Sequence, residues 1–384
     1  MSEPTVILVA NDVIPGMGLP VAAPGLRAFG LAAGLRRHGC RVITVVDGAP
    51  LRSLHPAGEP PALPEATVVR EGAAIGEFAA AHSPAVVVIT NSNQFDRLRL
   101  VPGLHLVVDL FAPKMLELAC NPGREDQARA MEVVRERKLR ALTAAEGFIV
   151  NGAKKVPYFL GWLLAAGRDP NATPLEVVPM GVPAHFAAAP TARTGVRFLV
   201  AGYLQGWSVP GPWLDRLAAR LDPPHATLDL LLPAHWGRRR HDEAALERVA
   251  ALAGRPGVTR HAAMPYEAYL GLMGRSDVAV DLFPHTLERE YAVVTRSVVA
   301  LSCGVPVIHP PFTEVSPLVA RYDAGWLVDP DDPEALEAVL DEVVGRPEVV
   351  AAKGAGARRL WAEVLDPEVA AAPLARLARR LLAG

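Results

Sequence analysis

Short apolar runs rich in valine and isoleucine recur along this 384-residue sequence, and stretches with helical periodicity separate them. Strands of a parallel sheet have this composition, because helices cover both faces and neither face meets water. The alternation predicts an α/β architecture with doubly wound parallel sheets. The expected strands are Val6–Ala10, Arg41–Val46, Ala85–Thr90, Leu104–Asp109, Gly147–Val150, Val196–Ala201, Thr227–Leu232, Val278–Leu282, Val305–His309 and Gly325–Val328.

A proline-rich segment from Val178 to Thr194 interrupts this alternation. A chain of 384 residues with 51% hydrophobic content exceeds one ordinary core and suits two domains of roughly 150 to 200 residues each. We therefore predict one Rossmann-like domain over residues 1–183, a linker over 184–195 and a second Rossmann-like domain over 196–365. The remaining residues, 366–384, form a helix with Leu374, Leu377 and Leu381 in phase, which should pack back on the body.

Two local signals support this assignment of elements. Gly39 follows a helical pattern and precedes the second strand, so the chain opens with a βαβ unit. Asp332-Pro333-Glu334 offers an N-cap, a proline at the first helical position and an early acid. A helix should therefore run from this motif to about Val344.

Charge and cysteine content exclude several classes of protein. The 39 basic and 41 acidic residues give a formal charge of -2, too little to attract nucleic acid or an anionic membrane. We expect no nucleic-acid partner. Peripheral membrane contact is left open, although no feature of the sequence indicates it. Cys40, Cys120 and Cys303 lack the paired spacing of a disulfide framework or zinc site. Without a signal-peptide pattern or a membrane-length apolar run, the sequence predicts a cytoplasmic protein.

The strongest local pattern is the segment Asp277–Ile308, DVAVDLFPHTLEREYAVVTRSVVALSCGVPVI. Its order of strand, acidic loop, helix and Cys-Gly-x-Pro-Val-Ile resembles the donor-binding region of GT-B glycosyltransferases. The segment VVPMGVP, from Val177 to Pro183, is similar to the interdomain segment of that fold. The resemblance implies two Rossmann-like domains facing a central cleft, with the acceptor on the N-terminal domain and a nucleotide sugar on the C-terminal one.

The N-terminal half resembles one branch of these enzymes, found in cell-surface polysaccharide assembly, through APGLRAFGLAAGLRRHGCRV, VVDLFAPKMLELA and FIVNGAKKVPYFLGWLLAAGR. That branch carries the pattern Leu-Glu-Thr-Glu-x-x-x-x-Thr-Arg, reproduced here, with Arg289 at the third place, by Leu287, Glu288, Glu290, Thr295 and Arg296. Many retaining enzymes of the broad family have two glutamates eight positions apart, where this chain has Tyr291 and Val299. The absence of this pair leaves the stereochemical outcome and the donor identity open.

A departing diphosphate is stabilised by cationic side chains and by amides at helix N-termini. Arg296, with Thr295 as a hydrogen-bond donor beside it, is the first candidate, and an arginine in a surface ion pair is the alternative. Glu288 and Glu290 are candidates to accept hydrogen bonds from hydroxyl groups of the donor sugar. A solvated acidic loop is the alternative for both glutamates.

Four further positions are candidates for donor binding. Gly202 and Gln205 follow the first strand of the second domain, either cradling phosphate with backbone N–H groups or forming a plain turn. Arg238 follows a strand at the carboxyl edge of the sheet, where it adds positive charge or lies in a solvated loop. In similar enzymes, backbone groups before a Pro-Tyr-x-x-Tyr helix hold the base, so Met264 is a nucleobase neighbour or part of a buried connection.

On the acceptor side, Asp109 ends an expected strand at a place where many related enzymes carry a histidine facing the sugar. Its carboxylate either serves as general base for an acceptor hydroxyl or caps the following turn. Asn11, Gly16 and Gly18 lie on the first loop. They either shape the acceptor site or, for the glycines, permit a tight turn.

No cofactor or metal is expected, because no Asp-x-Asp element lies in a suitable loop and His235 and His241 are separated by arginines. The predicted activity is metal-independent transfer of a sugar from a nucleoside-diphosphate donor to an unidentified hydroxyl-bearing acceptor: a glycan, a lipid-linked glycan or a natural product. Two alternatives remain, a nucleotide-sugar 2-epimerase and a non-catalytic binding protein with the same fold.

Overall fold

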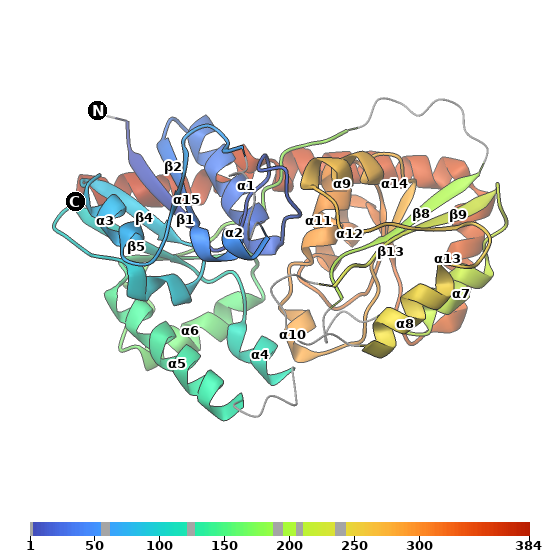
Figure 1. Cartoon of the computed structure of the whole chain (residues 1–384), viewed down its shortest axis with the longest axis horizontal. Coiled ribbons are helices and arrows are strands. Elements are labelled where there is room, and N and C mark those ends of the chain that lie inside the picture. The colour runs from blue at the N-terminus through green and yellow to red at the C-terminus, as the bar shows by residue number, and fades with distance from the viewer. Residues whose placement is uncertain (1–2, 55–61, 121–126, 187–194, 205–209, 235–242) are drawn as a thin grey trace. The chain divides into compact units, whose positions relative to one another are not determined.

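The computed structural model describes residues 3–54, 62–120, 127–186, 195–204, 210–234 and 243–384 (Figure 1). The chain divides into two compact units, each built on a parallel sheet. The first unit comprises Met1–Pro183 and Val364–Gly384, and the second comprises Ala184–Glu363.

The first unit holds a seven-stranded sheet in the order β3-β2-β1-β4-β5-β6-β7, with all strands parallel. The strands are β1 (Thr5–Ala10), β2 (Arg41–Asp47), β3 (Thr67–Arg70), β4 (Ala85–Ile89), β5 (Leu104–Asp109), β6 (Gly147–Val150) and β7 (Leu175–Val177). The helices are α1 (Ala23–Arg37), α2 (Gly48–Leu54), α3 (Ala74–Ala80), α4 (Lys114–Ala119), α5 (Gln127–Ala144), α6 (Lys155–Ala165) and α15 (Pro367–Ala383), with a 3-10 helix over Ser92–Arg97.

Alternate residues of the central strand β1 enter two different cores. Val6 and Leu8 pack with α1 and α15 on one face, whereas Ile7 and Val9 pack with α3, α5 and α6 on the other. This double burial explains why the strand is apolar throughout. The red helix α15 thus lies along the first unit, beside α1, although it comes last in the chain (Figure 1).

The second unit holds a six-stranded parallel sheet in the order β10-β9-β8-β11-β12-β13. The strands are β8 (Val196–Ala201), β9 (Ala226–Leu231), β10 (Val258–Arg260), β11 (Val278–Val280), β12 (Val307–His309) and β13 (Gly325–Leu327). The helices are α7 (Trp213–Ala219), α8 (Glu243–Leu252), α9 (Tyr266–Met273), α10 (Leu287–Glu290), α11 (Thr295–Ser302), α12 (Ser316–Tyr322), α13 (Pro333–Gly345) and α14 (Pro347–Leu360), followed by a π-helical turn over Trp361–Leu365. Helices α7, α8 and α13 cover one face of this sheet.

The predicted α/β class is confirmed, and each expected strand is present. The prediction for β11 was too long, since the strand ends at Val280 and places Asp281 in the following loop. The helix predicted after Asp332 is confirmed as α13, and the Asp332 carboxylate accepts a hydrogen bond from Ala335 N–H at 2.9 Å. The sequence reading missed β3, β7 and β10, which are short edge strands with partly exposed residues.

Candidate functional site

The strand order of the second sheet marks one place for a ligand. Connections from β8 run to β9 on one side, whereas β11 pairs with β8 on the other, so the order reverses between β8 and β11. In open α/β sheets, ligands bind beyond the carboxyl ends of the strands at such a reversal. Gly202 follows β8 and Asp281 follows β11. These two residues therefore flank the expected ligand position of the second unit.

Arg296 lies at this position. Its Nη2 atom donates to Asp281 Oδ1 at 2.7 Å, and its side chain is 19% exposed. The Arg296 side chain packs directly against Gly202, where a Cβ atom would lie 2.5 Å from Arg296 Nη1 and where the φ of 142° favours glycine. The Nε atom of Arg296 is buried and has no hydrogen-bond partner among the described residues. The structure thus brings together two residues that were predicted separately for phosphate binding.

Helix α11 adds a positive helix end beside this arginine. The helix begins at Thr295, its N-cap Val294 has no capping side chain, and its first turn holds no acidic residue. The first backbone N–H groups of such a helix remain available to an anion, and the helix dipole favours negative charge there. Thr295, the predicted hydrogen-bond donor, is the first residue of this helix.

Phe283 packs beneath two arginines. Its ring is fully buried, with the Arg296 guanidinium carbon 5.8 Å and the Arg289 guanidinium carbon 5.3 Å from the ring centroid. Cations over an aromatic face are attracted by its quadrupole. Arg289, which sequence reasoning treated as a variable position, therefore belongs to the site.

The two glutamates predicted for sugar binding have different environments. Glu288 is buried and forms a two-point ion pair with its neighbour Arg289, at 2.7 Å from Oε1 to Nη2. Glu290 is half-buried, and its Oε1 lies 2.7 Å from His285 Nε2. Both residues lie on α10, which Thr286 caps through a hydrogen bond from Arg289 N–H. Their contact with a donor sugar remains a prediction.

Below Arg296 lies a chain of buried polar side chains that the sequence reading missed. Ser297 Oγ lies 2.6 Å from Asp281 Oδ2 and 3.0 Å from His309 Nδ1, and His309 Nε2 lies 2.7 Å from Thr313 Oγ1. Burial lowers the pKa of His309 to about 4, although the Asp281 charge opposes this effect. The sign of these side chains in the sequence was a polar residue at the end of an apolar run or directly after it.

Of the three remaining candidates for donor binding, the structure describes one. Gln205 and Arg238 lie outside the described residues. Met264 is half-buried in the connection between β10 and α9, directly before the tyrosines Tyr266 and Tyr269. Its role beside a nucleobase stays a prediction.

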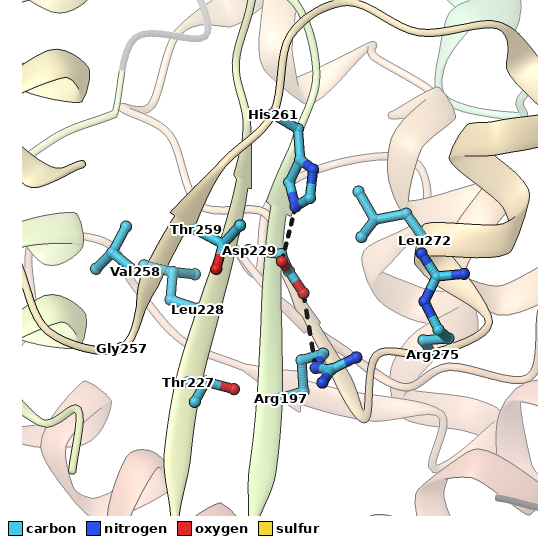
Figure 2. A pocket seen from close by; sticks show the side chains of 10 residues that line it. All are labelled: Arg197, Thr227, Leu228, Asp229, Gly257, Val258, Thr259, His261, Leu272 and Arg275. Atoms are coloured by element: carbon cyan, nitrogen blue, oxygen red, sulfur yellow. Dashed lines mark hydrogen bonds and ion pairs between the residues drawn. The ribbon is translucent and has the colours of Figure 1, made fainter. Parts of the chain in front are cut away.

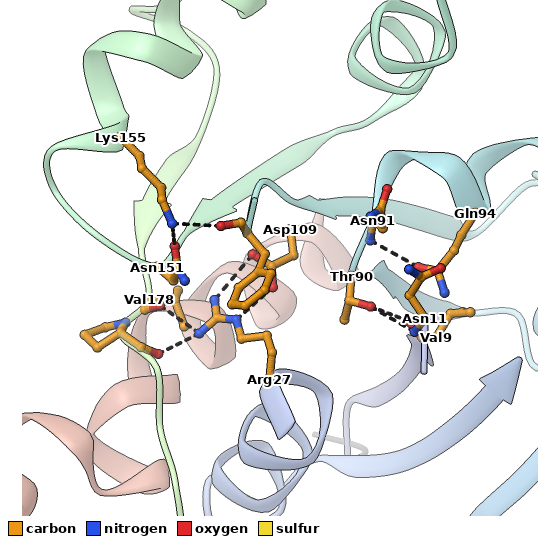
Figure 3. A network of polar contacts seen from close by, with 12 residues as sticks. Val9, Asn11, Arg27, Thr90, Asn91, Gln94, Asp109, Asn151, Lys155 and Val178 are labelled. Atoms are coloured by element: carbon orange, nitrogen blue, oxygen red, sulfur yellow. Dashed lines mark hydrogen bonds and ion pairs between the residues drawn. The ribbon is translucent and has the colours of Figure 1, made fainter. Parts of the chain in front are cut away.

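In the first unit the strand order reverses between β1 and β4. The Asn11 N–H donates to Thr90 Oγ1 at 3.2 Å, which joins the ends of these two strands (Figure 3). Next to this junction, Asn91 caps the 3-10 helix and accepts a hydrogen bond from Asn93 N–H at 3.0 Å. Gly16 and Gly18, at φ of 89° and 68°, shape the loop that follows β1.

Asp109 is engaged in an interior ion pair rather than open to an acceptor. Arg27 Nε donates to Asp109 Oδ2 at 2.8 Å, and both side chains are inaccessible (Figure 3). Arg27 also donates to the carbonyl oxygens of Val178 and Pro179, so the pair ties α1 and β5 to the segment after β7. Burial raises the pKa of Asp109, and the neighbouring Arg27 lowers it in part. This arrangement explains Asp109 as a buried counter-ion.

Asp12 is a carboxylate that the sequence reading overlooked. It follows β1 directly after Asn11, is 7% exposed, and accepts a hydrogen bond from Val13 N–H at 2.8 Å. Burial raises the pKa of Asp12 to about 6, and the Val13 hydrogen bond lowers it in part. A carboxylate with a pKa close to neutrality is suited to proton transfer.

A pocket of about 350 Å³ lies elsewhere in the second unit, around Asp229 (Figure 2). Asp229 Oδ1 lies 2.7 Å from His261 Nε2, and Oδ2 lies 3.7 Å from Arg197 Nε. Much of the lining precedes or lies within strands, as Gly257 and Arg275 do, whereas ligands of open α/β sheets bind at the carboxyl ends. We therefore place the candidate site at Arg296 and not in this pocket.

Within the described ranges, no group of three or more His, Cys, Asp or Glu side chains is arranged to hold a metal ion. None of the described helices combines the length and the apolar character needed to cross a bilayer.

The sequence matches no protein-family model and no curated protein. The structure is similar to that of sucrose-phosphate synthase from Thermosynechococcus elongatus, with a TM-score of 0.69 and 15% identity, covering 99% of this chain and 100% of that one. It is also similar to HepE from Anabaena in complex with UDP and glucose, with a TM-score of 0.65 and 14% identity over 98% and 100% of the chains.

A third similar structure is the catalytic domain of starch synthase IV from Arabidopsis thaliana, bound to ADP and acarbose. Its TM-score is 0.67 and its identity 9%, with all of both chains covered. These neighbours are GT-B glycosyltransferases, and the fold of this chain is GT-B.

Proposed function

We propose that this GT-B chain is a glycosyltransferase that moves a sugar from a nucleoside-diphosphate donor to a hydroxyl group of an acceptor. The observation that carries the proposal is the position of Arg296, beside Gly202 and the N-terminus of α11 at the strand-order reversal of the second sheet. The structural neighbours that were solved with UDP and glucose or with ADP support a nucleotide donor.

Arg296 and α11 would stabilise the leaving group. In the transfer, the bond from the anomeric carbon to the diphosphate oxygen breaks, its electron pair stays on the diphosphate, and the acceptor oxygen forms the new bond. Negative charge therefore grows on the diphosphate, where a guanidinium and helix amides lower the barrier. Because these groups supply positive charge, we propose that the transfer needs no metal ion and no separate cofactor. Glu288 and Glu290 stay candidates for contacts to the sugar.

On the acceptor side, we propose Asp12 as the general base. Asp109 was the sequence-based candidate, but its two carboxylate oxygens face Arg27 in the interior. Asp12 lies at the carboxyl end of β1, at the strand-order reversal of the first sheet, where a ligand of this unit would bind. The acceptor would be a glycan, a lipid-linked glycan or a natural product.

The test is release of nucleoside diphosphate from a panel of nucleotide sugars, with and without acceptors. Arg296→Ala should lower the turnover at least about tenfold, which corresponds to roughly 1.4 kcal/mol. Arg220→Ala is the matched control, because Arg220 pairs with Glu337 and Asp341 on α13, outside the site. Equal turnover in Arg296→Ala and in the control would contradict the phosphate role. Acceptor-free conversion of one nucleotide sugar to its epimer would instead show a 2-epimerase, and nucleotide binding without turnover a binding protein.

A further inference from the structure

The carboxylate of Asp281 is held between two donors. It accepts hydrogen bonds from Arg296 Nη2 at 2.7 Å and from Ser297 Oγ at 2.6 Å, and the residue is 6% exposed. Ser297 follows Arg296 directly on α11, so one carboxylate fixes two consecutive residues of the first helical turn. Arg296 is thereby tied to the carboxyl end of β11.

The order of protons along the buried chain follows from the chemistry of its members. An ionised carboxylate only accepts, so the single hydroxyl proton of Ser297 points to Asp281, and Ser297 Oγ must accept from His309 Nδ1. In a neutral imidazole with its proton on Nδ1, Nε2 is an acceptor, so Thr313 Oγ1 donates to it. In each of the three hydrogen bonds, the donor is therefore the residue farther along the chain from Asp281.

The far end of the chain is anchored in the backbone. Thr313 Oγ1 accepts from Val315 N–H at 3.1 Å and also lies 3.0 Å from Ser316 Oγ. The Thr313 N–H donates to Ser316 Oγ at 2.9 Å, and Ser316 Oγ donates to the Pro310 carbonyl at 2.7 Å. The loop between β12 and α12 thus holds the imidazole in one orientation.

We propose that Asp281, oriented by the chain Ser297–His309–Thr313, is a positioning residue that fixes the Arg296 guanidinium for the donor diphosphate. This inference rests on the proposed function. A free arginine side chain samples many rotamers, and ordering it on binding would weaken affinity. A guanidinium that is already fixed against Gly202 and above Phe283 avoids this loss.

The test compares binding of a nucleoside diphosphate with binding of its nucleoside. Among UDP, ADP, GDP and dTDP, the one that raises the melting temperature of the full chain most is titrated by calorimetry, together with the matching nucleoside. Asp281→Asn keeps the size of the side chain but replaces an acceptor oxygen by an NH₂ donor and removes the charge. We expect about tenfold weaker binding of the diphosphate, equivalent to about 1.4 kcal/mol, and nucleoside binding within about twofold of the wild type.

A double-mutant cycle separates positioning from general stability. If Asp281 acts through Arg296, then Asp281→Asn should add less than about twofold to the loss already caused by Arg296→Ala. Glu342→Gln is the matched control, because this carboxylate accepts from Trp326 on the other side of the unit and should leave both affinities unchanged. Ser297→Ala removes one hydrogen bond of the chain and serves as a second, milder variant, with a loss confined to the diphosphate.

The outcomes are distinguishable. Equal losses for diphosphate and nucleoside, or full additivity with Arg296→Ala, would overturn the positioning role while the proposed transferase function stands. Wild-type protein that binds none of the four diphosphates would overturn the proposed function and this inference with it.

Discussion

At the residue scale, the site depends on buried titratable groups whose charge states differ. His309 is fully buried and neutral, whereas Asp12 lies beneath the surface of the first unit with a pKa raised to about 6. Each group leads to a prediction about pH dependence. Burial disfavours the charged form of both groups, which lowers the pKa of His309 and raises the pKa of Asp12.

His309 should make the protein less stable in mild acid. Its pKa falls from 6.5 to about 4 on folding, so between these values the unfolded chain binds a proton that the folded chain does not. The free energy of unfolding should therefore drop as pH falls from 6.5 to 4, by about 3 kcal/mol in total, with no such effect above pH 6.5.

Urea unfolding of the wild type and of His309→Gln at several pH values measures this effect. The difference in unfolding free energy between the two proteins should be constant above pH 6.5 and should shift in favour of the variant below it. A constant difference down to pH 4.5 would contradict a neutral buried imidazole.

Asp12 should control the pH profile of turnover. A general base must be ionised, so kcat/KM should rise with pH through about 6 and then level off. Asp12→Asn should lower kcat by about a hundredfold and abolish this rise of kcat/KM with pH. Asp96→Asn, which removes an exposed carboxylate paired with Arg137 and Arg140, is the control. If kcat/KM of Asp12→Asn rose with pH as in the wild type, the general base would be another residue.

At the scale of elements, the junction between β8 and the segment after it determines whether Arg296 fits. Gly202→Ala places a methyl group into the guanidinium and forces a φ of 142° on alanine. We expect at least about tenfold weaker binding of the nucleoside diphosphate and a stability loss of about 1–3 kcal/mol.

The matched control for this change is Gly39→Ala. Gly39 follows the C-cap of α1 with a φ of 71° and has open space around its Cβ position, so an alanine there suffers backbone strain without a clash. Calorimetry on both variants should show a stability loss in each and an affinity loss in Gly202→Ala alone. Equal affinities would show that Arg296 adapts to a side chain at position 202.

The central strands could be predicted from the sequence because both of their faces are buried. Edge strands such as β7, with the sequence LEV, lack this apolar signature, so local pattern could not reveal them. Arg296 and Gly202 were predicted from the family pattern and from a turn after a strand. The chain from Asp281 to His309 was not, because its members are 12 and 16 residues apart from Ser297 and meet only when β11, α11 and β12 are assembled.

At the scale of the whole molecule, α15 belongs to the unit formed by the beginning of the chain. Leu374 and Leu377 are fully buried in the same core as β1 and α1. Gly34 of α1 lies so close that a Cβ there would be 2.0 Å from the Pro367 carbonyl oxygen. Stability of the first unit therefore depends on residues far along the sequence.

Leu377→Ala should destabilise the first unit by about 2–5 kcal/mol, because it opens a cavity in a fully buried core. Val369→Ala on the same helix is the control, since Val369 is exposed and its truncation should change stability by less than about 0.5 kcal/mol. Thermal unfolding followed by circular dichroism measures both. Equal melting temperatures would show that α15 does not contribute to the core.

The place of α15 also sets an order of events during synthesis. Domains usually fold as they leave the ribosome, beginning with the N-terminal one. Here the core around β1 and α1 stays incomplete until residues 367–383 have emerged, by which time the whole second unit has been translated. The first unit to be made is thus the last that can finish folding, and during that interval the face of its sheet awaiting α15 is a surface for chaperones to protect.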